Sequence, residues 1–205
     1  MDLSIQKLSK AFNQRPVFSE LTVTIPSGSR FAITGANGSG KSTLLKIISG
    51  GLLPTKGHIS YSLGGHAISE DVLYRYVHFV APYNTVIEEL NLPELFHLHR
   101  RLGLLKAYHD YGSWAKLLDY QFHPERQIKT FSSGMKQRVK LALALLDDRP
   151  LILLDEPGSN LDMQGKAWFF GLLDKLNSDQ TLIIASNDPV EIAHCSTAIS
   201  VEQKL

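Results

Sequence analysis

A glycine-rich segment near residue 40 has the composition and spacing of a loop that binds phosphates. Its residues are Gly35, Ala36, Asn37, Gly38, Ser39, Gly40, Lys41, Ser42 and Thr43, and they match the pattern G-x-x-x-x-G-K-[ST] through Ser42. Glycines let the backbone close around phosphates, and amide hydrogens at a helix start face the negative charge. In this pattern Lys41 reaches the terminal phosphates and the Ser42 hydroxyl binds Mg²⁺. A glycine-rich turn without a ligand is the alternative, and the predicted strand before the segment and helix after it favour the phosphate loop.

Two carboxylates after an apolar run supply the second half of such a site. Residues 151–154 are Leu-Ile-Leu-Leu, and Asp155 and Glu156 follow directly. A strand of this composition lies inside a sheet, and its end lies at the edge where ligands bind in α/β folds. We expect Asp155 to hold Mg²⁺, directly or through water, and Glu156 to orient and deprotonate an attacking water. Acids are common at strand ends, so this assignment depends on the phosphate loop.

The elements that must position these residues alternate between strands and helices. Alternating apolar and polar residues predict strands with one buried face at 3–5, 21–25 and 59–63. Short apolar runs predict central strands at 30–34, 76–80, 151–154 and 181–185. Apolar residues at helical spacing predict helices at 41–49, 135–146 and 164–176. This order indicates an α/β fold with a mainly parallel sheet and an antiparallel layer beside it.

Residues 83–125 interrupt this alternation and predict a helical subdomain. It would be inserted in a core of residues 1–82 and 126–205, so that 1–205 form one domain. The sequence Asn91-Leu92-Pro93 is typical of a helix start. Gly103 and Gly112 separate two further short helices, and we expect the second to begin near Ser113.

Two further segments and one aromatic residue make the sequence resemble an ATP-binding cassette (ABC) ATPase, the P-loop ATPase subunit of ABC transporters. Residues 131–138, Phe-Ser-Ser-Gly-Met-Lys-Gln-Arg, are similar to the family's signature motif, Leu-Ser-Gly-Gly-Gln followed by Gln-Arg. Residues 157–162, Pro-Gly-Ser-Asn-Leu-Asp, resemble the loop that follows the catalytic glutamate. Phe12 stands where family members place an aromatic ring against adenine. The resemblance spans nearly the whole chain and agrees with an inserted helical subdomain before the signature.

The resemblance implies ATP and Mg²⁺ as ligands and a head-to-tail dimer of cassettes. Each ATP would lie between the phosphate loop of one subunit and the signature of the other. The residues of this chain that would contact nucleotide in trans are Ser132, Ser133, Gly134 and Asp162. A hydroxyl and a backbone amide at a helix start suit a γ-phosphate. A serine at this place also caps the helix that follows, and the two roles use the same geometry.

Two positions depart from the family pattern. Pro82 stands where a glutamine usually senses Mg²⁺ and the lytic water, and proline has neither a side-chain amide nor a backbone donor. Asn187 stands where a histidine usually contacts the γ-phosphate. Asparagine can donate one hydrogen bond but cannot become a cation. Two hypotheses follow: hydrolysis persists slowly through Glu156 with Asn187 as a substitute, or the cassette binds ATP for dimerisation with little turnover.

The composition narrows the class of protein. The 205 residues are 43% hydrophobic and 20% charged, with a formal net charge of +1. This composition is that of a folded protein, and the charge argues against a broad basic face for nucleic acid. Cys195 is the only cysteine, no apolar run approaches the ~18 residues of a membrane span, and residues 1–10 do not resemble a signal peptide. We therefore expect a cytoplasmic protein that reaches the membrane through a separate permease.

The sequence leaves open the role of the chain and the composition of its dimer. The chain could be an ABC ATPase that moves no solute, or a cassette whose dimerisation is regulatory. The natural dimer could be homomeric or heteromeric. The short chain and the Met135 that ends the signature resemble small exporter-type members, such as those associated with haem or cytochrome c maturation.

His97 and His99 are two residues apart and face different sides of a helix, so they make a poor metal chelate.

Overall fold

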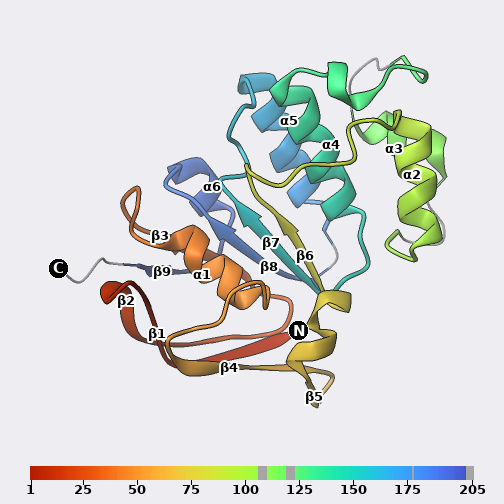
Figure 1. The fold of residues 1–205 in the computed structure, drawn as a ribbon. Coiled ribbons are helices and arrows are strands. Elements are labelled where there is room, and N and C mark those ends of the chain that lie inside the picture. Colours follow the sequence, from red (N-terminus) through yellow and green to blue (C-terminus); the bar gives the residue numbers. More distant parts are fainter. Residues whose placement is uncertain (106–109, 119–122, 177, 202–205) are drawn as a thin grey trace. The chain divides into compact units, whose positions relative to one another are not determined.

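A computed structural model describes residues 1–105, 110–118, 123–176 and 178–201 (Figure 1). The chain divides into two compact units. The first contains Met1–Phe79, Arg149–Glu156 and the described part of Asn177–Leu205, and the second contains Val80–Asp148 and Pro157–Leu176. Among the described residues, no helix has both the length and the apolar character that crossing a bilayer requires.

The first unit is built on two sheets. The antiparallel sheet has the order β2-β1-β4-β5, with β1 Asp2–Phe12, β2 Arg15–Ile25, β4 Lys56–Leu63 and β5 His66–Ile68. The second sheet has the order β6-β7-β8-β3-β9, with β6 Val77–Val80, β7 Leu151–Asp155, β8 Thr181–Ala185, β3 Arg30–Thr34 and β9 Thr197–Ser200. The pairs of β7 with β8, β8 with β3 and β3 with β9 are parallel. The predicted mixed α/β fold is confirmed.

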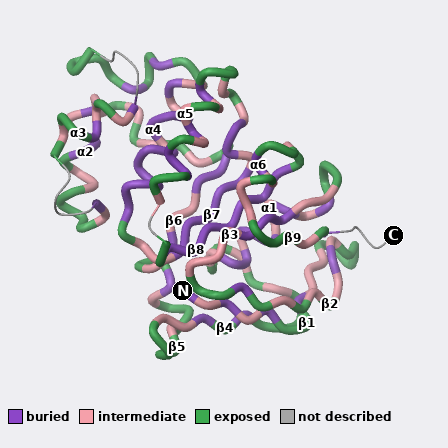
Figure 2. Tube along the Cα trace, turned by 180° about the vertical axis from the view of Figure 1, so that it is seen from behind, coloured by how far each residue is buried: buried purple, intermediate pink, exposed green. Residues whose placement is uncertain are grey.

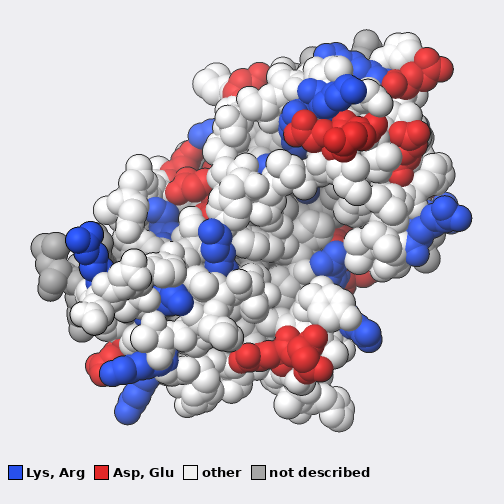
Figure 3. All heavy atoms as spheres, in the orientation of Figure 1, with Lys and Arg blue, Asp and Glu red and all other residues white. Residues whose placement is uncertain are grey.

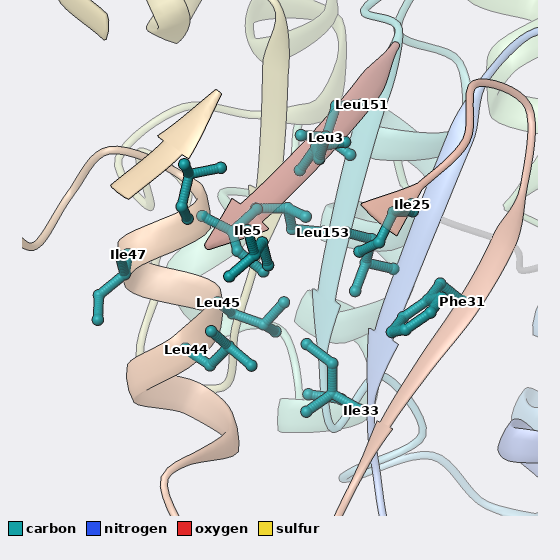
Figure 4. Close-up of a cluster of buried hydrophobic side chains, with 14 of the residues drawn as sticks. Leu3, Ile5, Ile25, Phe31, Ile33, Leu44, Leu45, Ile47, Leu151 and Leu153 are labelled. Carbon is teal, nitrogen blue, oxygen red and sulfur yellow. The ribbon is translucent and has the colours of Figure 1, made fainter. Parts of the chain in front are cut away.

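Helix α1 fills the space between these sheets. It runs from Lys41 to Ile48, and its Leu44, Leu45, Ile47 and Ile48 are buried. They pack in one cluster with Leu3 of β1 and with β3 and β7 residues (Figure 4). Strand β1 alternates buried and less buried residues near its start, whereas all residues of β7 and β8 are buried (Figure 2). The alternating strands therefore cover one side of α1, and the continuous apolar strands form the interior of the parallel sheet.

The remaining elements of the first unit were not predicted. They are the short strands β5 and β9, the 3₁₀ helix at Glu70–Arg75 and helix α6 at Pro189–Ala193. Each is short, and β9 (Thr-Ala-Ile-Ser) lacks the apolar run that identifies a buried strand. It is held by parallel pairing with β3, an interaction between residues far apart in the sequence.

The second unit is helical. Its elements are α2 (Leu92–Arg101), α3 (Tyr111–Leu117), a 3₁₀ turn at Ile128–Thr130, α4 (Ser133–Leu145) and α5 (Met163–Leu173). They enclose a core in which Phe96 and Trp114 are fully buried, and the Trp168 indole donates to the Leu117 carbonyl at 2.6 Å. The unit includes α4 and α5 as well as residues of the predicted subdomain 83–125, so the boundaries of that subdomain stay a prediction.

Capping residues explain where these helices begin. Asn91 and Glu94 form a reciprocal capping box at the start of α2, as the Asn-Leu-Pro sequence predicts. Helix α3 begins at Tyr111, because the Asp110 carboxylate accepts from the Ser113 amide at 2.9 Å. Gly112 therefore lies inside α3, and the helix starts two residues before Ser113, near which its start was predicted. The helix predicted between Gly103 and Gly112 falls partly on 106–109, outside the described residues.

Candidate functional site

The phosphate loop connects β3 to α1 and depends on two glycines. Gly35 and Gly40 have φ of 140° and 107°, which side-chain-bearing residues rarely adopt. A Cβ on Gly35 would lie 2.4 Å from the Val201 carbonyl oxygen, and one on Gly40 would lie 2.4 Å from Val17 Cγ1. The backbone is thus in contact with neighbouring elements at both ends of the loop. Its middle residues, 36–38, are exposed and open to a ligand.

Lys41 is almost fully buried, and its ammonium lies beside the loop. Its Nζ donates to the Gly35 carbonyl at 2.8 Å and to the Ala36 carbonyl at 3.4 Å. The same atom lies 3.7 Å from Glu156 Oε1. The lysine therefore ties the loop to the end of β7 and holds a positive charge where an anion would lie. Ser42 and Thr43 follow in the first turn of α1.

Asp155 ends β7 as a buried carboxylate with an incomplete set of partners. It is 1% exposed, and the Ser42 hydroxyl donates to it. Its Oδ1 is buried without a hydrogen-bond partner among the described residues. Burial raises the pKa of Asp155, although the Ser42 hydrogen bond and the nearby Lys41 charge lower it. A buried carboxylate oxygen without a partner is costly, so its presence suggests a ligand.

The oxygens of Ser42 and Asp155 fit Mg²⁺. This ion prefers oxygen ligands, and it is usually bound by one or two carboxylates together with substrate phosphates and waters. The partnerless Oδ1 of Asp155 and the adjacent Ser42 hydroxyl supply such ligands beside the phosphate loop.

Glu156 is held by its backbone in a strained conformation. Its φ is 45°, and its amide donates to the Ala185 carbonyl of β8 at 2.8 Å. Non-glycine residues in this region are uncommon and concentrate at functional sites. The side chain is 38% exposed, and burial raises the pKa of the carboxyl, while the Lys41 charge opposes this shift. A carboxyl with a raised pKa beside an open loop suits a general base.

Asn187 is brought to the phosphate loop by the end of β8. Its Nδ2 donates to Oδ1 of Asn37 at 2.9 Å. The sequence predicts Asn187 at this edge, but the partner was missed because the two residues are 150 positions apart. Phe12 lies at the end of β1 with its side chain 48% exposed.

The signature residues lie in the second unit at the start of α4. Ser132 is the N-cap, and its hydroxyl accepts from the Met135 amide at 3.2 Å. A Cβ on Gly134 would lie 2.8 Å from the Asn160 carbonyl oxygen, so only glycine fits there without a shift. A polar pocket of about 370 Å³ is lined by Ser132, Ser133, Gly134, Met135, Arg138, Asn160, Leu161, Asp162 and Gln164. Asp162 caps α5 by accepting from the Gly165 amide at 2.6 Å.

Helix α4 is also attached to the segment that contains Pro82. Lys140 Nζ donates to the carbonyls of Ala81 and Asn84 at 3.1 and 3.2 Å. Lys136 Nζ lies 2.6 Å from Glu88 Oε2. Gln137, also in α4, donates to the Pro157 carbonyl at 2.8 Å. None of these contacts was predicted, because each joins residues that are 20 or more positions apart and whose spacing has no pattern.

The structure therefore gathers the predicted residues into two groups. The phosphate loop, Asp155, Glu156 and Asn187 lie together in the first unit, linked by the contacts of Lys41, Ser42 and Asn37. Ser132, Ser133, Gly134 and Asp162 lie together around the pocket of the second unit. Each group by itself has the polar atoms of an anion site.

The buried charge of Asp155 predicts that Asp155→Asn stabilises the chain in the absence of ligands at pH 7. Because the folded-state pKa is raised, the folded protein binds more protons than the unfolded one between the ordinary and raised values, and stability falls as pH rises through that window. The asparagine amide carries no charge and avoids the cost of burying one. A gain of about 1 kcal/mol in the free energy of unfolding would raise the Tm by ~2–4 °C. Thermal denaturation without Mg²⁺ or nucleotide measures it. The gain should shrink towards pH 4, and the exposed control Glu125→Gln should change little; a lower Tm for Asp155→Asn at pH 7 would contradict the interpretation.

Comparisons with known proteins agree with this geometry. The family described as "ABC transporter" matches residues 18–159. The lantibiotic transport ATP-binding protein SrtF of Streptococcus pyogenes is 30% identical over 210 residues, covering 96% of this chain and 85% of the relative. The cytochrome c biogenesis ATP-binding export protein CcmA of Brucella abortus (strain 2308) is 30% identical over 191 residues, covering 93% and 87%. A dimeric ATP-binding cassette bound to ADP and Pi in a post-hydrolysis state superimposes with a TM-score of 0.82 at 23% identity, over 98% of this chain and 94% of that one. With its phosphate loop, buried aspartate and signature helix in place, the chain belongs to the ABC transporter family, as an ATP-binding cassette.

Proposed function

We propose that this cassette hydrolyses ATP with water activated by Glu156, as one half of a head-to-tail dimer that drives a separate membrane permease. One observation carries the proposal. Lys41 Nζ lies 3.7 Å from Glu156 Oε1, and Ser42 donates to the buried Asp155, so a cation for phosphate, a site for Mg²⁺ and a base lie at one sheet edge. These are the parts that phosphoryl transfer to water requires.

The phosphate loop binds and orients the triphosphate. The loop residues 35–40 present backbone amides at the start of α1, where the helix dipole favours an anion. Lys41 exchanges its hydrogen bonds with the Gly35 and Ala36 carbonyls for contacts with the terminal phosphates. Ser42 and Asp155 would hold Mg²⁺, and the ion would supply positive charge against the charge that develops on the transferring phosphate.

Glu156 orients the attacking water and removes its proton. Its backbone hydrogen bond to Ala185 fixes the direction in which the side chain leaves the strand. The raised pKa increases its affinity for a proton, which favours proton transfer from water. Asn187 supports the γ-phosphate by one neutral hydrogen bond, so we expect slower turnover than a cationic side chain would give.

The second subunit completes the site. Ser132 and the backbone amide of Gly134 would contact the γ-phosphate of the partner's ATP, with Ser133 and Asp162 beside them in the same pocket. The relatives SrtF and CcmA are named for transport and export. By analogy the chain acts on the cytoplasmic face of a membrane, bound to a permease that is a different polypeptide. The face drawn in Figure 3 has both signs of charge interspersed, which agrees with a protein rather than a nucleic-acid partner.

A regulatory cassette with little turnover is the second candidate. It is favoured by Pro82, which has neither a side-chain amide nor a backbone donor, and by Asn187, which cannot become cationic. In this case ATP closes the dimer and another subunit performs most of the hydrolysis.

Replacement of the proposed base distinguishes these functions. Glu156→Gln should lower the steady-state ATPase rate by ~10²–10³-fold, because the amide cannot accept the proton of water. ATP affinity should be retained, since Lys41, Ser42 and Asp155 are untouched. The rate is measured as phosphate release at saturating MgATP, with Glu125→Gln as the control. A rate that Glu156→Gln leaves unchanged excludes Glu156 as the base, and an undetectable rate in the wild type with intact ATP-driven dimerisation supports the regulatory cassette.

A second substitution tests the role of Asn187. Asn187→His should raise kcat by ~10-fold or more, because an imidazolium restores a charge-assisted contact with the transferring phosphate. The ratio of the Asn187→His rate to the wild-type rate should fall as pH rises through about 6.5, the usual pKa of histidine. Asn187→Ala serves as the matched loss-of-contact variant and should lower kcat. If the three proteins have equal kcat between pH 6 and 8, Asn187 makes no contact in the rate-determining step.

A further inference from the structure

The aromatic residue at the end of β1 is presented by a tight hairpin. Asn13 and Gln14, the two residues between β1 and β2, have φ of 47° and 65°, the left-handed values of a two-residue hairpin turn. Phe12 pairs with Arg15 across this turn, and its side chain is 48% exposed. The ring therefore stands at a fixed end of a ladder but remains accessible to a ligand.

Lys10 lies over this ring. Its Nζ is 4.8 Å from the centroid of Phe12, within the range of a cation–π interaction. The same Nζ donates to the Leu53 carbonyl at 2.8 Å. Residues 10 and 12 are two apart in a strand, so their side chains share one face of the sheet. The ammonium is thus held between a carbonyl and the ring.

The turn that provides this carbonyl is itself attached to β1. The Thr55 amide donates to the Ser9 carbonyl at 2.8 Å, and the Ala11 amide donates to Thr55 Oγ1 at 3.0 Å. These bonds fix the residues on either side of Lys10 against residues 53–55. Lys10 and Phe12 therefore lie on a stretch of backbone that is held on both sides of Lys10.

The hairpin also touches the phosphate loop. A Cβ on Gly40 would lie 2.4 Å from Val17 Cγ1 and 3.3 Å from Phe18 Cδ1, so β2 lies directly against the end of the loop. This contact places β2, the partner strand of β1, beside the loop, and in the proposed site the base of a nucleotide bound there reaches the ring of Phe12. One ring face is covered by the ammonium, and the exposed remainder of the ring is left for the base.

We propose that Lys10 is a positioning residue for base binding, which covers one face of Phe12 and leaves the other for a purine. This rests on the proposed function, in which Phe12 receives the adenine of ATP. A cation on one face draws electron density from the opposite face and favours stacking of an electron-rich purine there. It also holds the ring in one orientation, which lowers the entropy lost when the base binds.

The proposal is tested with the full chain and two ligands, MgATP and Mg-tripolyphosphate, the second of which has no base. Lys10→Met keeps the length of the side chain and removes the charge, and it should weaken MgATP binding by about 3–5-fold while tripolyphosphate binding stays within about 1.5-fold. Lys10→Arg should restore ATP affinity, since guanidinium also binds aromatic faces. Lys7→Met, an exposed lysine of the same strand, is the matched control for charge.

The variant Phe12→Ala distinguishes the role of Phe12 from the role of Lys10. In that background Lys10→Met should have no further effect on ATP affinity, because the ring through which it acts is gone. Equal losses for ATP and tripolyphosphate, or a full effect of Lys10→Met without Phe12, overturn the role of Lys10. Unchanged ATP affinity in Phe12→Ala overturns both Phe12 as the adenine platform and the role assigned to Lys10. If Lys41→Ala leaves tripolyphosphate binding intact, the proposed phosphate site fails, a result that does not involve Lys10.

Discussion

The site depends on keeping one carboxylate out of water. Asp155 follows four buried apolar residues of β7 and is 1% exposed, with Oδ1 lacking a partner among the described residues. A carboxylate in such surroundings is unfavourable without a cation, and burial raises its pKa accordingly. The neighbouring elements reduce this cost only in part. Helix α1 supplies the Ser42 hydroxyl and the Lys41 charge, so the same helix that packs the core also completes the site.

The local chemistry of this site could be predicted from the sequence. The phosphate loop, the Asp155–Glu156 pair and the start of α4 are contiguous, and their glycines, caps and apolar runs act over a few residues. For the same reason the central strands and the long helices were predicted close to their observed bounds. The roles of the site residues stay predictions, because the structure shows their arrangement and not their ligands.

What could not be predicted consists of interactions between distant segments. Asn187 and Asn37 are joined by one amide hydrogen bond, and no periodicity in the sequence marks either residue. Strand β9 exists because β3 offers a free edge, since Thr197–Ser200 has little apolar character of its own. The start of α3 at Tyr111 was missed for a different reason: Gly112 usually ends helices, but the Asp110 cap overrides its preference.

Helix α4 holds the segment around Pro82, the position at which the chain departs from the family's glutamine. Proline has no amide hydrogen to donate, yet the carbonyls of Ala81, directly before it, and of Asn84, two residues after it, accept from Lys140. Lys136, one turn earlier, pairs with Glu88, and the helix that holds both lysines is capped by the signature residue Ser132. A helix of this length is stiff along its axis because its backbone hydrogen bonds are internal. Within the second unit, segment 81–88 is therefore connected to the signature residues through α4, by contacts that do not require a side-chain amide at position 82.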